Sequence, residues 1–331
     1  MSDRVNGLQN KVNGTIDIAK IIMAILVVGI HTEPFGFNIW LDRIFGIATR
    51  FCVPFFFVAS SYFFFKGSKK IVSYTKRISI LYLVWSLIYL PLNIPLLAEM
   101  SIGEVLLLLF WHGNNHSLWY LLASIIGLFI TYGLIKLFKG NIKATLILSV
   151  FILLIGCAIS TYEPLTGKIL PHAKTIADNI GYRNGLFYAF PYMALGALIA
   201  SNSQESKNSI SPYKMLLGLT LSVILLAIES LILIVYFNAH STILWMAMLP
   251  ASYFLFMFLL SIKISIHKNI ALFFRKMSTL IYVSHTLFIV AFNKLNTYKY
   301  FLAVFLCAFL LSYSIVFLSE KKYFTWMKYL Y

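Results

Sequence analysis

The chain has 331 residues, of which 60% are hydrophobic, 17% are aromatic and only 11% are charged, and its mean hydropathy is +0.84. Soluble domains contain about 25% charged residues, so this composition excludes soluble, disordered and fibrous proteins and predicts an all-α polytopic membrane protein. The net charge of +16 would also suit a nucleic-acid-binding protein, and the placement of the basic residues has to decide between the two.

Long apolar stretches recur along the whole chain. A membrane-spanning helix needs about 20 mostly apolar residues. That criterion predicts ten spans, near residues 16–34, 43–65, 78–98, 117–138, 142–160, 185–201, 213–237, 243–262, 278–293 and 299–319. The stretch Val105–Trp111 is too short to cross and is predicted to be re-entrant or interfacial.

These spans also predict the domain organisation. We expect one membrane domain, residues 16–319, between an N-terminal tail of residues 1–15 and a C-terminal tail of residues 320–331. No internal repeat or soluble domain is evident. The first apolar run contains no small-residue cleavage site, so it is expected to remain as the first span and not to be removed as a signal peptide.

Basic residues gather on one side of the predicted membrane. If the N-terminus is cytoplasmic, cytoplasmic segments hold 19 of the 27 Lys and Arg residues and outer segments hold 6, while Lys20 and Arg50 lie within spans. The positive-inside rule expects such a bias, and contact with anionic lipid explains the basic charge. Both termini are therefore predicted to be cytoplasmic, and no nucleic-acid partner is expected.

The cysteines give no sign of a disulfide or a metal site. Cys52, Cys157 and Cys307 all lie in apolar runs, an odd number cannot pair completely, and no Cys/His cluster has metal-ligand spacing. We interpret all three as buried small hydrophobic residues, and no bound metal is expected.

The first predicted span contains Asp17, Lys20, His31 and Glu33. A charge at the bilayer centre costs about 2.5–3.5 kcal/mol, so each needs a reason. Helical geometry places Asp17, Lys20 and His31 on one stripe, with His31 about 16 Å from Lys20 along the axis. This stripe is predicted to line a cavity or a helix interface. Two alternatives stay open: an ordinary Asp17–Lys20 pair at the cytoplasmic interface, and a structural role for His31. Pro34 favours a helix end near Glu33.

Later spans contain further polar residues. Arg50 should have an acidic or substrate partner, and Pro54 is predicted to kink the second span and free a carbonyl. Glu229 is expected to be a protonated, buried side chain that bonds to a neighbouring helix. Tyr282 and His285 are three residues apart and share a helix face.

Two more residues are ambiguous from their pattern alone. Trp119 is either an ordinary interfacial aromatic residue or part of a site, and Arg183 is either a headgroup anchor or a site residue. Periodicity therefore leaves the function open.

Five blocks of sequence occur in a distinctive order. They are residues 16–34 with Asp17, Lys20 and His31; Val53–Ser60, which includes Pro-Phe-Phe-Phe; Ser117–Gly127; Tyr182–Gly185; and Tyr282–His285. In this order they resemble the acyltransferase-3 superfamily of ten-span bacterial membrane acyltransferases, and within it the membrane domain of vancomycin-resistance serine racemases. The resemblance extends over residues 16–285.

Two residues depart from the family pattern. Lys20 stands where the family usually has arginine, and lysine lacks the bidentate fork that arginine offers to phosphate or carboxylate. Ser61 stands where the family usually has glycine, which narrows any close backbone approach there. Racemase activity is not expected, because the sequence ends at Tyr331 without a soluble catalytic barrel.

The resemblance implies acyl transfer across a bacterial plasma membrane. Acyl-CoA, by default acetyl-CoA, would approach as a co-substrate from the cytoplasm, and a hydroxyl group of a cell-envelope glycan would accept the acyl group on the outer side. No permanently bound cofactor is implied. Histidine with a pKa near 6.5 suits deprotonation of a hydroxyl at neutral pH, so His31 is predicted to be the general base. A covalent acyl-histidine is the alternative.

The resemblance also suggests roles for the other candidates. Lys20, Lys76 and Arg77 would hold the CoA phosphates, although Lys76 and Arg77 are equally an ordinary positive-inside cluster. Arg50 would stabilise an oxyanion or the CoA diphosphate. Glu33 would orient His31 or attract a cation. The remaining candidates would contact the acceptor or line a pore, and they are Ser60, Trp119, Arg183, Tyr282 and His285.

A rival hypothesis is a transporter of a small amino acid such as serine, without acyl chemistry. The racemase relatives suggest it, since such a membrane domain could supply serine to its own enzyme. The sequence offers no inverted repeat and no matching pair of Gly/Pro-broken helices, which transporters often contain. A histidine together with cytoplasmic basic groups is also easier to explain with CoA.

Overall fold

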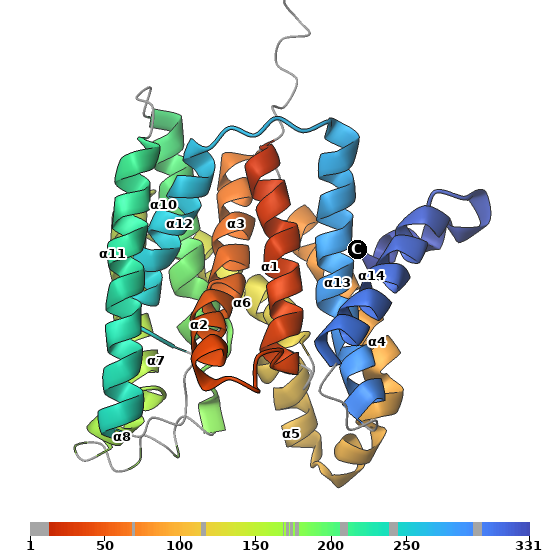
Figure 1. Cartoon of the computed structure of the whole chain (residues 1–331), viewed down its shortest axis with the longest axis horizontal. Coiled ribbons are helices and arrows are strands. Elements are labelled where there is room, and N and C mark those ends of the chain that lie inside the picture. Colours follow the sequence, from red (N-terminus) through yellow and green to blue (C-terminus); the bar gives the residue numbers. More distant parts are fainter. Residues whose placement is uncertain are drawn as a thin grey trace, which may run out of the picture.

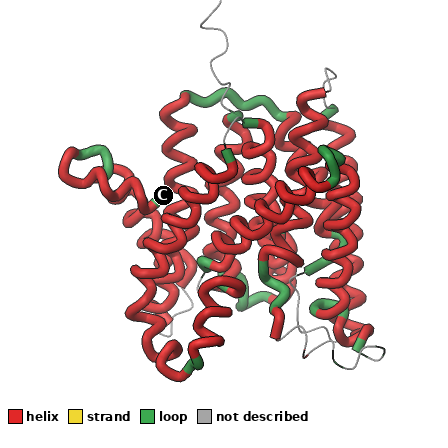
Figure 2. The backbone as a smooth tube through the Cα atoms, turned by 180° about the vertical axis from the view of Figure 1, so that it is seen from behind, coloured by secondary structure: helices red, strands yellow, loops and turns green. Residues whose placement is uncertain are grey.

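The computed structural model describes residues 13–67, 70–113, 117–167, 169, 172, 175, 179–205, 211–237, 244–293 and 300–331. Within these residues the backbone forms helices and connecting loops and contains no β-strand (Figures 1 and 2). The prediction of an all-α protein is confirmed.

The helices follow one another with short connections. Their bounds are α1 (Gly14–Thr32), α2 (Ile39–Arg50), α3 (Cys52–Lys66), α4 (Ile71–Glu99), α5 (Ile102–Leu107), α6 (Trp119–Leu137), α7 (Ile142–Ile159), α8 (Glu163–Thr166), α10 (Phe190–Glu205), α11 (Pro212–Leu231), α12 (Met248–Ser261), α13 (Lys268–Asn293) and α14 (Tyr300–Leu318). Shorter helical turns are η2 (Leu108–His112), η3 (Gly185–Ala189), η4 (Ile232–Tyr236) and η5 (Lys322–Leu330).

Seven helical stretches in the described residues are long and apolar enough to cross a membrane, as expected of a multi-pass membrane protein. They are Gly14–Thr32, Trp40–Lys66, Ile71–Glu99, Trp119–Leu137, Ile142–Ile159, Pro212–Tyr236 and Tyr300–Ser319, and each overlaps one predicted span. The other three predicted spans also fall on helices, namely η3 with α10, α12 and α13. These three are not among the seven stretches, so a total of ten spans stays a prediction.

Helix α13 begins ten residues earlier than the predicted span at residue 278. Its first turns contain Lys268, Arg275 and Lys276, so they lack the apolar character on which the span prediction depends. Charged residues do not prevent helix formation where a neighbouring helix offers them partners.

The second predicted span is broken where proline was expected to act. Helix α2 ends at Arg50 and α3 begins at Cys52, with Phe51 between them. Pro54 has no N–H to donate to the carbonyl four residues earlier, at Arg50. The span is thus interrupted near Pro54, where the kink was predicted, and α2 and α3 are separate helices there (Figure 1).

The connections of the bundle lie at two opposite ends. The beginning of α1 and the linker from α12 to α13 lie at one end, which we call the Asp17 end (Figure 1). The last turn of α1, α5 and α8 lie at the other, which we call the His31 end (Figure 1). The prediction places the Asp17 end in the cytoplasm.

Helix α1 lies inside the bundle, where it packs against α13 and α14 on one side and against α3 and α12 on the other. Helices α3 and α10 cross closely at Gly196, where an added Cβ would lie 2.5 Å from the Val58 carbonyl oxygen and 2.9 Å from Cβ of Ser61. Ser61 is buried, and its hydroxyl donates to the Met193 carbonyl at 2.6 Å. Ser61 was expected to narrow the space for a close backbone approach. The glycine on the opposite helix, Gly196, provides the space that allows α3 and α10 to cross closely there.

Two short segments complete the fold. The predicted re-entrant or interfacial stretch forms α5 and η2, which together are too short to cross. The predicted C-terminal tail contains η5, which is tied to α4 because the Trp85 indole donates to the Leu330 carbonyl at 3.0 Å. Most of the predicted N-terminal tail lies outside the described residues.

Candidate functional site

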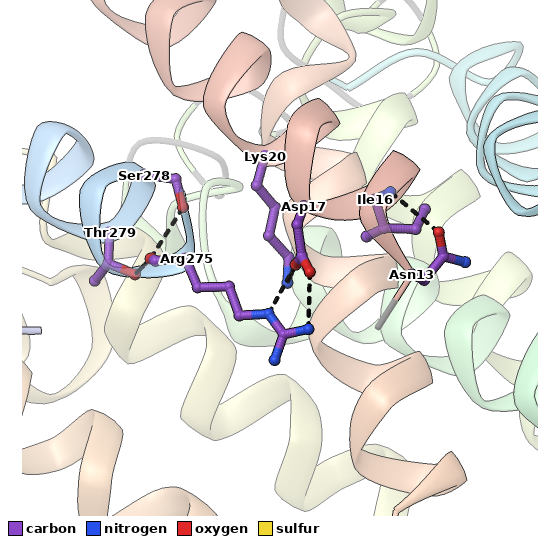
Figure 3. Close-up of polar contacts among 7 residues, drawn as sticks. All are labelled: Asn13, Ile16, Asp17, Lys20, Arg275, Ser278 and Thr279. Carbon is purple, nitrogen blue, oxygen red and sulfur yellow. Dashed lines mark hydrogen bonds and ion pairs between the residues drawn. The ribbon is translucent and has the colours of Figure 1, made fainter. Parts of the chain in front are cut away.

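A buried ion cluster occupies the Asp17 end of α1 (Figure 3). Asp17 is fully buried and accepts two hydrogen bonds from Arg275 of α13, from Nε to Oδ1 and from Nη2 to Oδ2, both 2.8 Å long. Lys20 adds a longer contact, 3.4 Å from Nζ to Oδ1. The predicted Asp17–Lys20 pair is present, but the bidentate arginine is its stronger partner.

Arg275 is the site residue that the sequence interpretation missed. It is separated from Asp17 by 258 residues, so no local spacing connects the two. The available signal was a basic segment directly before a predicted apolar span, which is also the usual pattern at a cytoplasmic interface.

Positive charge exceeds negative charge in this cluster. The charges of Asp17, Arg275 and Arg77 all act on Lys20, so this region holds three basic side chains and one carboxylate, and two of the basic side chains contact that carboxylate. The Lys20 ammonium also lies 4.8 Å from the centre of the Phe63 ring, a cation–π contact. Arg77 and Lys76 are both exposed on α4. This excess of positive charge can hold an anion such as phosphate.

A histidine pair occupies the His31 end. The rings of His31, in the last turn of α1, and His285, on α13, have centroids 5.5 Å apart and an interplanar angle of 30°. His31 is exposed, whereas His285 is fully buried. Packing of α1 on α13 therefore brings together two histidines that are far apart in the sequence. His31 and Lys20 lie about 16 Å apart along α1.

Tyr282 fastens α13 to the start of α6. Its hydroxyl donates to the Ser117 carbonyl at 2.5 Å, while the Ser117 hydroxyl contacts the Tyr282 carbonyl at 3.4 Å and Thr286 Oγ1 at 2.8 Å. Two of the family-like sequence blocks thus meet directly. Tyr282 is positioned as a buried brace beside His285, with ring centroids 6.0 Å apart.

Aromatic side chains surround this brace. Tyr120 packs on Tyr282 at 5.2 Å and on Phe57 at 4.7 Å, and its hydroxyl lies 3.4 Å from that of Ser60. Trp119 stacks on Tyr188 with a centroid distance of 5.8 Å and an angle of 13°. Ser60 and Trp119 therefore belong to one aromatic cluster with Tyr282, rather than to separate surface sites.

The two predicted arginines are near neighbours. Arg183, in the loop before η3, acts electrostatically on both Arg50 and His31, and Arg50 also acts on Tyr188. Arg50 and Arg183 therefore belong to the His31 end. This location disfavours a role for Arg50 at the Asp17 cluster, where the predicted phosphate site lies.

Glu33 is the residue directly after α1, and its side chain does not continue the helix face that carries Asp17, Lys20 and His31. Its φ of 43° places it in the left-handed region, and its N–H donates to the Gly29 carbonyl at 3.1 Å. Its side chain is exposed, and within the described residues its carboxylate forms no hydrogen bond or ion pair with His31. This geometry does not support the suggestion that Glu33 orients His31.

Glu229 has a structural environment. Its two carboxylate oxygens accept hydrogen bonds from the Tyr162 hydroxyl at 2.5 Å, the Met246 N–H at 2.7 Å and the Ala247 N–H at 2.8 Å. Both backbone donors lie at the start of α12, where a negative charge is stabilised by the helix dipole. The predicted bond from Glu229 to a neighbouring helix is therefore present. Burial and the hydrogen bond to Glu229 raise the pKa of the Tyr162 phenol, which stays a donor.

The cysteines were predicted to be buried apolar residues. Cys52 and Cys157 are buried, as expected, and Cys307 is partly buried. In the described part of the chain, no group of three His, Cys, Asp or Glu side chains is arranged to hold a metal ion.

Comparison with known proteins gives the following matches. A family profile described as an acyltransferase domain, of the acyltransferase-3 type, matches residues 13–321. Two amino-acid racemases of Enterococcus faecalis are 26% and 28% identical to the chain, over 95% and 62% of its length and 47% and 31% of their own. A serine/alanine racemase of Enterococcus gallinarum is 28% identical, over 66% of the chain and 33% of its own length.

The chain thus spans about half or less of the length of these curated relatives. No solved structure matches it.

Proposed function

The chain belongs to the acyltransferase-3 family, and on this premise we propose that it transfers an acyl group, by default acetyl, from cytoplasmic acyl-CoA to a hydroxyl group of a cell-envelope glycan. The observation that supports this most is the arrangement on α1. A cationic cluster surrounds Lys20 at one end, and an exposed histidine, His31, lies about 16 Å away on the same helix. The extended pantetheine arm of CoA has a comparable length.

In this proposal the Asp17 end binds the nucleotide part of CoA. Arg275 and Lys20 are held by Asp17, and exposed Arg77 and Lys76 lie on the neighbouring α4. Arg275 supplies a guanidinium beside Lys20, at the position where the family usually has arginine. Asp17 binds its Nε and Nη2, so Nη1 and the second hydrogen of Nη2 would face a phosphate. The Arg275 side chain is 41% exposed. A phosphate could therefore bind its open side without breaking the ion pair with Asp17.

His31 is the proposed general base at the other end. It would take the proton of the acceptor hydroxyl while that oxygen attacks the thioester carbonyl carbon, and the C–S bond would then break. The thiolate of CoA leaves and takes up the proton from His31, so the base is regenerated. Arg50 or Arg183 would stabilise the negative oxygen of the tetrahedral intermediate, because both are close to the His31 end.

The test uses purified protein in lipid nanodiscs with acetyl-CoA, with and without envelope glycan. We expect glycan-dependent release of free CoA that falls by about a hundredfold or more in His31→Ala, the usual contribution of a general base. His267→Ala is the matched control, because His267 is an exposed loop histidine before α13 at the opposite end. If wild type and His31→Ala released CoA equally, the proposed acyl transfer would stand, but His31 would not be the general base.

A second candidate is transport of a small amino acid, which the name of the serine/alanine racemase relative favours. Under this hypothesis the membrane domain moves serine and acetyl-CoA is irrelevant. Proteoliposomes that take up labelled serine, together with no binding of acetyl-CoA, would support transport over acyl transfer. Acetyl-CoA-dependent chemistry without serine flux would give the reverse conclusion.

A further inference from the structure

His285 has a buried nitrogen atom without a partner. Its Nε2 is inaccessible to solvent and forms no hydrogen bond to any residue that the structure describes. Leaving a buried polar atom unpaired costs about 1–3 kcal/mol. Such atoms are rare in folded proteins, and each one needs an explanation.

The other ring nitrogen determines the proton on His285. Nδ1 lies 2.6 Å from the Tyr282 carbonyl oxygen and 3.2 Å from that of Ile281. A carbonyl oxygen only accepts, so Nδ1 must carry a hydrogen. In that tautomer Nε2 is a bare acceptor, and its orientation is fixed by the backbone of α13.

His31 lies at a suitable distance to donate a hydrogen bond to Nε2 of His285. Two imidazoles joined by one N–H···N bond have centroids about 5.4 Å apart, from a bond of about 3 Å and about 1.2 Å within each ring. The observed separation of 5.5 Å is within a few tenths of an ångström of that value. The Tyr282 ring is the other aromatic neighbour of His285, at 6.0 Å, but its hydroxyl is already bonded to Ser117.

We propose that His285 is a positioning residue for His31: its Nε2 accepts a hydrogen bond from one ring N–H of His31 and so leaves the other nitrogen of His31 unprotonated toward the acceptor hydroxyl. This inference rests on the proposed function and gives His285 the role that a carboxylate has in a catalytic triad. It also explains why Glu33 need not contact His31. Small rotations of the exposed His31 ring during substrate binding would close the bond, as apo hydrogen bonds at catalytic sites often do.

Two substitutions separate this role from a structural one. Asparagine at residue 285 keeps a donor near the position of Nδ1 and loses the acceptor near Nε2, whereas glutamine keeps an acceptor near Nε2 and loses the bond to Tyr282. We expect His285→Asn to lower kcat for glycan-dependent CoA release at least about tenfold with little change in KM for acetyl-CoA. His285→Gln should retain most of the wild-type kcat. A purely structural His285 would give the opposite order, and that order would overturn the proposal.

A second measurement does not depend on turnover. Nitrogen-15 labelling of the seven histidines, with the His31 signals assigned by their loss in His31→Ala, reports the tautomer of His31 by NMR. The proposal expects one tautomer in wild type and His285→Gln and a mixture in His285→Asn. Equal tautomer populations in all three would refute it. If wild type releases no CoA but the tautomer pattern holds, the proposed reaction fails while the pairing of the two histidines stands.

Discussion

The two ends of α1 use polar groups in opposite ways. At the Asp17 end, a buried carboxylate has three short or moderate contacts with two cations, and both of its oxygens are engaged. In the described residues four polar atoms are buried without a partner, namely His285 Nε2, Ser284 Oγ, Tyr192 OH and Ser86 Oγ; His285 lies at the His31 end, and none of the four belongs to the Asp17 cluster. At the Asp17 end the carboxylate is bonded to neighbouring cations. At the His31 end a buried ring nitrogen has no hydrogen-bond partner in the described residues.

This difference fits a division between holding and reacting. A satisfied ion cluster fixes helix positions and presents a constant positive field. Unpaired groups cost stability, and such costs are tolerated where a ligand or a reacting group completes the site. This difference supports the proposed function, in which the Asp17 end would bind the co-substrate and the His31 end would perform the chemistry.

Removal of Arg275 should have the largest effect on stability. Arg275→Ala leaves the fully buried Asp17 with only the longer contact to Lys20. Loss of one partner from a fully buried ion pair costs about 3–5 kcal/mol. Because Arg275 is 41% exposed and Lys20 stays beside Asp17, we expect the lower end of that range, and a clear fall in the melting temperature in nanodiscs. Lys276→Ala is the matched control, because its 3.7 Å pair with the exposed Glu320 is worth at most about 1 kcal/mol. If both variants lost the same amount of stability, the Asp17–Arg275 pair would be no stronger than an ordinary surface ion pair.

Between the two ends, the close crossing of α3 and α10 should be intolerant of bulk. Gly196→Ala places a methyl group against the Val58 carbonyl and Ser61, and overpacking of this kind costs about 1–3 kcal/mol. Gly133→Ala on α6 is the control, since no atom lies within 4 Å of its added Cβ, and it should be neutral or stabilising by about 0.5–1 kcal/mol. Thermal unfolding of both variants measures this. A neutral Gly196→Ala would mean that the helices separate easily there.

The smallest effect is expected for Glu229, which lies outside both ends of the α1 stripe. Glu229→Gln replaces one carboxylate oxygen by an amide donor, so one of its three hydrogen-bond donors loses its acceptor. We expect a loss of about 1–2 kcal/mol in stability and unchanged turnover per folded molecule. A loss of turnover without a loss of stability would place Glu229 in the reaction and extend the chemistry beyond the His31 end.

Composition and local spacing predicted the parts of the molecule that depend on nearby residues. The apolar runs gave the seven long helices, Pro54 gave the break between α2 and α3, and the three-residue spacing gave the Asp17–Lys20 contact. The family resemblance, now confirmed, came from ordered blocks such as Tyr282–His285.

Contacts between distant segments could not be obtained in this way. The Asp17–Arg275 pair and the His31–His285 pair each join α1 to α13, and one sequence contains no sign of which helices are neighbours. Gly196 was overlooked because its importance depends on facing Ser61 across the crossing. The helix end that Pro34 predicted near Glu33 is present, but the direction of the Glu33 side chain follows from a left-handed backbone conformation that the sequence pattern does not specify.

The central claim, that binding and chemistry lie at opposite ends of α1, is tested most directly by two variants in one assay. The dissociation constant for acetyl-CoA and kcat for CoA release would be measured for Arg77→Ala and His31→Ala. The account predicts a crossed result: Arg77→Ala weakens binding several-fold and leaves kcat near wild type, whereas His31→Ala leaves binding unchanged and lowers kcat about a hundredfold or more. Loss of both quantities together in each variant would contradict the division.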